Sequence, residues 1–176
     1  MEIFSLVFPY LNNKIQYSVI ESLNLSMFSK LTSPLRSVSV AANVCVAIDS
    51  ALTIIHENNL SLDPSVGQLL IDSLKKIEFY NDSYLMKLKA DCIGLTCAAV
   101  NRHEGNIKKN QFVSVQTNIL IKNVVDKDDS YLRILYALSL AAIYKYNSQT
   151  APFGSIFEVV FALIQDPHPV VHTWSL

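Results

Sequence analysis

The chain has 176 residues, of which 51% are hydrophobic and only 16% are charged, and its formal net charge is −1. This balance excludes a typical nucleic-acid-binding protein, because such proteins carry a concentrated basic excess. With four glycines and six prolines the chain has few turn signals and long apolar segments, which favours an all-α protein. The three cysteines, Cys45, Cys92 and Cys97, lie in apolar stretches and indicate reduced core thiols in the cytoplasm.

The first third of the chain predicts two long helices. Residues 3–11 are apolar, but they follow an acidic residue and contain Pro9, so we do not expect a signal peptide. Asn13 is the candidate cap of a helix over residues 14–31. The next helix is expected over 34–57, where a proline suits the first turn. The apolar residues of the first helix recur every four positions, at Ile15, Val19, Leu23, Met27 and Leu31.

Part of the second helix raises the question of a membrane span. Residues 38–55 are mostly apolar, and this length approaches that of a transmembrane helix. However, the segment contains Asn43 and Asp49, and a central aspartate is costly in hydrocarbon. A helix buried between neighbouring helices explains the pattern better, and a small helical membrane protein stays as a distant alternative.

A third helix start is the pair Asp63-Pro64. An apolar stripe follows it at helical spacing, from Val66 through Leu70 and Leu74 to Ile77. Lys75 and Lys76 interrupt that stripe, so we expect both to face outward.

An internal repeat organises the second half of the chain. The segment Asp82-Ser83-Tyr84-Leu85 recurs 47 residues later as Asp129-Ser130-Tyr131-Leu132, and each copy opens an apolar stretch with helical periodicity. Helices are expected over 84–101, 111–125, 131–146 and 152–164. Leu135 should face inward, and Gly94 with its neighbouring alanines should let another helix approach closely.

A repeat of this length predicts a HEAT/armadillo-like α-solenoid of stacked antiparallel helix pairs, with residues 1–176 forming a single segment. Trp174-Ser175-Leu176 matches Tyr136-Ala137-Leu138 and belongs to a third copy that stops early. Because solenoid ends need polar caps, we expect truncation at the C-terminus. The apolar start suggests the same at the N-terminus, and a non-functional remnant reading frame is an alternative.

Two segments carry a resemblance to a known family. Residues 90–105, ADCIGLTCAAVNRHEG, and residues 163–176, LIQDPHPVVHTWSL, resemble the HEAT-repeat-containing protein 5 family. The second string is the more specific, since it joins a turn to a helix start in an uncommon residue order. The resemblance covers about the second half of the chain. Fungal members are very long accessory proteins of the clathrin adaptor used at the trans-Golgi network and endosomes.

The resemblance implies a non-enzymatic protein-interaction scaffold in clathrin-adaptor-dependent vesicle traffic between trans-Golgi network and endosomes. It further implies a cytoplasmic protein that reaches Golgi or endosome membranes peripherally, through protein partners such as the adaptor complex. A scaffold of the same architecture from another pathway, such as a nuclear transport receptor fragment, is the alternative.

Candidate partner-binding residues are basic or aromatic. Lys108 and Lys109, with Lys87 and Lys89, form a small basic ridge that suits acidic peptides or lipid headgroups, although a solvated helix end explains it more simply.

Several tyrosines form a second candidate surface. They would anchor partner peptides, although packing between repeats is the simpler interpretation. They are Tyr144 and Tyr146, with Tyr84, Tyr131 and Tyr136.

No pattern predicts catalysis, a cofactor, a metal or a small-molecule substrate. His103-Glu104 lacks the second histidine of a zinc-protease helix, and Cys92 with Cys97 lacks a second ligand pair. His168 lies between prolines, outside the helix that contains His172. The glycines are scattered singly, so no phosphate-binding loop is expected.

Overall fold

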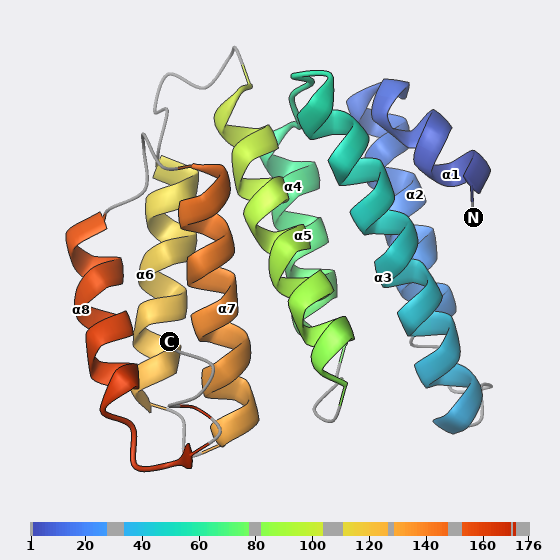
Figure 1. The fold of residues 1–176 in the computed structure, drawn as a ribbon. Coiled ribbons are helices and arrows are strands. Elements are labelled where there is room, and N and C mark those ends of the chain that lie inside the picture. Colours follow the sequence, from blue (N-terminus) through green and yellow to red (C-terminus); the bar gives the residue numbers. More distant parts are fainter. Residues whose placement is uncertain are drawn as a thin grey trace.

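The computed structural model describes residues 2–27, 34–77, 82–103, 111–126, 129–147, 153–169 and 171, and these are all-α, with no strand among them. The helices expected over 34–57, 84–101, 111–125 and 131–146 are confirmed to within one residue. None of the helices in these ranges is both long and apolar enough for a membrane span. In chain order the elements are α1 (Glu2–Val7), the 3-10 helix η1 (Phe8–Tyr10), α2 (Asn13–Met27), α3 (Pro34–Glu57), α4 (Pro64–Lys75), α5 (Ser83–Asn101), α6 (Gln111–Asp126), α7 (Ser130–Tyr146) and α8 (Phe153–Ile164) (Figure 1).

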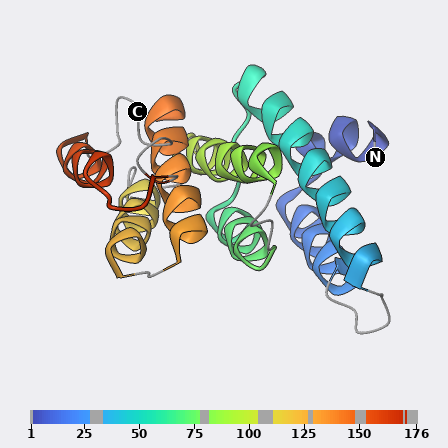
Figure 2. The ribbon, with the colours of Figure 1, turned by 60° about the horizontal axis from the view of Figure 1, so that its bottom comes forward.

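The helices lie in two rows, which Figure 2 shows from one end. The first row is α3, α5 and α7, in which α5 packs against both neighbours, and the three helices run in the same direction (Figure 1). The second row is α2, α4 and α6, where Gln116 of α6 donates to Gln68 of α4 at 2.9 Å. α8 packs beside α6 and α7 at one end, and α1 packs against α3 at the other.

Aspartate caps start the helices where the sequence predicts them. Asp63 Oδ1 accepts a hydrogen bond from the Ser65 backbone N–H at 2.8 Å at the start of α4. The two copies of the repeated tetrapeptide behave alike, since Asp82 accepts from the Leu85 N–H and Asp129 from the Tyr131 N–H. Each cap satisfies donors that a helix start otherwise leaves open.

The repeat extends beyond the tetrapeptide. Positions 47 residues apart are buried together, at Val66 of α4 and Val113 of α6, and again at Ile77, just after α4, and Val124 of α6. In the first row Cys45, Cys92 and Ser139 occupy equivalent places on α3, α5 and α7, and all three are fully buried. Helix pairs of one pattern therefore recur along the described chain.

The centre of the core is the second half of α5, where every residue from Cys92 to Val100 is buried. α3, α7, α4 and α6 all contact this helix, so no side of this half faces solvent. The inward position expected for Leu135 on α7 is confirmed, because that side chain is only 6% exposed.

The expectations for α2 are partly wrong. The cap is Asn12, whose Oδ1 accepts from the Ile15 N–H at 3.0 Å, and the helix begins at Asn13. Its fully buried face contains Gln16 and Ile20, while Ile15 of the predicted stripe is 45% exposed and Val19 only half-buried. Gln16 belongs to the buried face because its amide donates to the Phe8 carbonyl at 3.0 Å. Residues 28–31 of the predicted helix lie outside the described part.

Candidate interaction surface

α5 and α7 approach each other most closely at Gly94. A Cβ atom at this position would lie 2.6 Å from the backbone carbonyl carbon and oxygen of Ala142. Asn147, just after α7, donates from Nδ2 to the Gly94 carbonyl at 3.3 Å and to the Ile143 carbonyl at 3.0 Å. The prediction that small residues let a neighbouring helix approach is confirmed at this crossing.

A groove of about 170 Å³ lies between the same two helices. Its walls combine small apolar side chains with one lysine from each helix. The lining residues are Lys87, Ala90 and Asp91 of α5 and Leu138, Ala141, Ala142 and Lys145 of α7.

Lys145 of this groove contacts a carboxylate and an aromatic ring. Its Nζ lies 3.4 Å from Asp91 Oδ1 and 4.6 Å from the ring centre of Tyr146. The hydrogen bond with Tyr146, followed by the charge of Asp91, raises the pKa of the Lys145 ammonium. The lysine therefore stays charged at neutral pH, in a side chain that is 61% exposed.

Asp49 of α3 lies next to this ion pair. Burial, and then the negative charge of Asp91, raise the pKa of the Asp49 carboxyl to about 6. The Cys92 thiol donates to Asp49 Oδ1 at 3.9 Å, which favours the ionised carboxylate. This carboxyl group therefore titrates just below neutral pH.

The C-terminal parts of α3, α5 and α7 are joined by aromatic and basic side chains. His56 of α3 and Tyr146 of α7 meet edge to face, with ring centres 5.3 Å apart. Arg102, which ends α5, donates from Nε to the Leu60 carbonyl at 2.9 Å. Burial, and then the charge of Arg102, lower the pKa of His56. At neutral pH the His56 ring is therefore uncharged.

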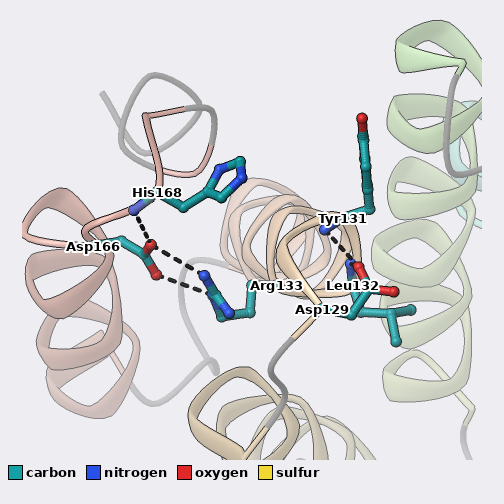
Figure 3. A network of polar contacts seen from close by, with 6 residues as sticks. All are labelled: Asp129, Tyr131, Leu132, Arg133, Asp166 and His168. Carbon is teal, nitrogen blue, oxygen red and sulfur yellow. Dashed lines mark hydrogen bonds and ion pairs between the residues drawn. The ribbon is translucent and has the colours of Figure 1, made fainter.

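An ion pair joins the first turn of α7 to the segment that follows α8, as Figure 3 shows. Arg133, in the first turn of α7, bonds both carboxylate oxygens of Asp166, at 3.0 and 3.1 Å. Asp166 also accepts from the His168 backbone N–H at 2.8 Å, so the Asp-Pro-His turn after α8 is tied to α7. His168 lies in this turn, outside α8, and His172 lies outside the described residues.

The tyrosines expected on one surface have different environments. Tyr146 is half-buried between His56 and Lys145, as a packing residue would be. Tyr144 is 37% exposed, and Tyr84 and Tyr131 at the starts of α5 and α7 are 63% and 41% exposed. Equivalent repeat positions thus place two tyrosines where solvent reaches them.

One of the four lysines expected in the basic ridge is not on the surface. Lys89 is buried, and its Nζ donates to the Ile77 carbonyl at 2.6 Å, just beyond the end of α4. Lys87 is exposed and lines the groove, while Lys108 and Lys109 lie outside the described residues. The sequence did not predict that Lys87 and Lys145 line the same groove, because their proximity depends on the register of α5 against α7. Of the outward pair on α4, Lys76 is exposed and Lys75 is half-buried.

The three cysteines are buried free thiols, as predicted. Burial raises the pKa of Cys97 to about 12, so this thiol stays protonated. Among the described residues, His, Cys, Asp and Glu side chains form no group that would hold a metal ion.

These features define an all-α protein built from repeated helix pairs. Over all 176 residues the chain is 62% identical to AP-1 accessory protein LAA1 of Saccharomyces cerevisiae, and it spans 9% of the length of that relative. The match confirms the resemblance to the fungal accessory proteins of the clathrin adaptor. No protein-family model matches the chain. No solved structure matches it either.

Proposed function

We propose that this chain is a HEAT/armadillo-like α-solenoid segment that acts as a non-enzymatic protein-interaction scaffold in clathrin-adaptor-dependent traffic between trans-Golgi network and endosomes. The observation that carries the proposal is the 62% identity to an AP-1 accessory protein along the whole chain. At this identity the two sequences are expected to share one fold, so a shared partner is the simplest expectation.

Two structural observations support the solenoid architecture. The described helices lie in two rows, and buried positions recur every 47 residues in both rows. Solenoids are built in this way, because each helix pair buries its apolar face only against the next pair. Such arrays offer long exposed surfaces, which suit the binding of large partners.

The proposed partner is the adaptor complex, and the proposed place is the cytoplasmic side of Golgi and endosome membranes, reached through protein partners. Among the polar side chains at the first row, Lys145 forms an ion pair, His56 and Tyr146 form a ring contact, and Arg102 donates a hydrogen bond just after α5. We assign no reaction to these groups.

A binding assay with purified components tests this function. The tagged chain is immobilised and incubated with purified AP-1 complex, and the Leu135→Asp variant, whose fold should be lost, is the matched control. We expect AP-1 to be retained by the chain and not by the variant. Equal retention by both, or by neither at micromolar concentrations, would contradict the proposal.

A further inference from the structure

We propose that the groove between α5 and α7 binds a short acidic peptide segment of a partner protein. This proposal rests on the scaffold function and names the chemistry of one ligand. The groove combines small side chains along its walls with a basic side chain from each helix.

The small side chains set how closely a peptide can approach. Three of the seven lining residues are alanines, at positions 90, 141 and 142, and Leu138 adds an apolar contact. A main chain with small or medium apolar side chains therefore fits against the helices, whereas bulky walls would hold it away. Ala141 is exposed, so the groove is open to solvent on this side.

The charges of the groove favour an anionic ligand. Its ionisable lining groups are Lys87, Lys145 and Asp91, so two positive charges face one negative charge. The Asp91 carboxylate lies 3.4 Å from Lys145, and this pairing weakens both the repulsion of Asp91 for a second carboxylate and the attraction of Lys145 for it, so the three groups together, with a net positive charge of one, attract an anion. Because the pKa of the Lys145 ammonium is raised, this lysine carries its charge at neutral pH.

Exposed tyrosines extend the same surface. Tyr84 precedes Lys87 by three residues on α5, so the two side chains lie on one side of that helix. Tyrosine supplies a large, partly apolar contact area and is frequent at interaction hot spots. A peptide leaving the groove toward the start of α5 would meet the Tyr84 ring, which is 63% exposed.

A peptide fits these observations better than a membrane. Recognition of anionic lipids usually needs clusters of about four to eight basic residues. The groove offers two lysines and one aspartate, and its small side chains lie in a hollow. An extended acidic segment reaches such a hollow, whereas a flat layer of headgroups does not.

Fluorescence anisotropy tests the proposal with a labelled peptide rich in glutamate and leucine. Lys87→Glu should weaken binding about tenfold, equivalent to about 1.4 kcal/mol. Ala141→Leu, which fills the groove without changing charge, should weaken it similarly. Lys122→Glu is the matched control, because Lys122 is exposed on α6 outside the groove, and its affinity should equal that of the unaltered chain.

Three outcomes would overturn the proposal. They are equal affinities for all variants, equal binding of a peptide with lysine in place of glutamate, and binding of phosphatidylserine vesicles but not of the peptide. Circular dichroism checks that each variant is folded. Loss of AP-1 binding with intact peptide binding would count against the scaffold function alone, so the two failures are distinguishable.

Discussion

The close crossing of α5 and α7 predicts that Gly94→Ala destabilises the protein. The added Cβ would lie 2.6 Å from backbone atoms of Ala142 and 2.9 Å from its Cβ, so the two helices must move apart. Overpacking of this kind costs about 1–3 kcal/mol, whereas alanine regains roughly 1 kcal/mol of helix propensity. Since the clash is with backbone atoms, the overpacking cost should lie in the upper part of this range, at about 2–3 kcal/mol, which leaves a net loss of about 1–2 kcal/mol in the free energy of unfolding.

Urea unfolding followed by circular dichroism measures this change. The matched control is Gly154→Ala on α8, where an added Cβ meets no atom within 4 Å, so its stability should stay the same or rise. Ala142→Gly in the Gly94→Ala background should restore only part of the loss, because backbone atoms stay in the way. Gly94→Ala with unchanged or higher stability would refute the packing described for this crossing.

Three further predictions concern the core, the pH response and the surface. Leu135→Asp places an unpaired charge in a site that is 6% exposed, and a loss of about 4 kcal/mol or more should abolish the cooperative thermal transition. Asp49→Asn should raise stability at pH 7 by roughly 1–2 kcal/mol, since the folded pKa of about 6 lies above the unfolded value. The folded state binds the extra proton, so the unaltered chain should lose stability from pH 4 to 6 in urea titrations, and the variant should lack that slope. Phe157 and Phe161 of α8 are 56% and 55% exposed with ring centres 6.3 Å apart, so we expect the chain to self-associate through this apolar pair. Changing both to serine should shift the chain toward monomer in analytical ultracentrifugation, and an unaltered chain that is already monomeric would contradict the expectation.

Helix boundaries in the second half of the chain were predictable because local signals carry them. Asp82 and Asp129 cap their helices through hydrogen bonds within three residues, and such contacts are encoded in the adjacent sequence. The spacing of the two copies also identified the repeat before any tertiary contact was known.

The properties that failed to follow from the sequence depend on contacts between helices. The spacing of apolar residues in α2 predicted a buried face through Ile15, but the structure buries Gln16 instead. Gln16 is buried because its amide bonds the Phe8 carbonyl, eight residues earlier, and the apolar pattern does not encode that contact. Lys89 was predicted to lie on the surface, but it is buried and its ammonium group donates a hydrogen bond to the Ile77 carbonyl just after α4. Lys87 and Lys145 are 58 positions apart in the sequence but line the same groove. Their proximity depends on how α5 packs against α7.

Cross-linking mass spectrometry of the chain with purified AP-1 tests the central claim most directly, because it reports both the complex and its location. The account predicts lysine cross-links to the adaptor that concentrate on the two exposed lysines of the first row, Lys87 of α5 and Lys145 of α7, and that disappear with Leu135→Asp. No cross-links, or cross-links that persist when the chain is unfolded, would contradict a role for this folded segment in binding the adaptor.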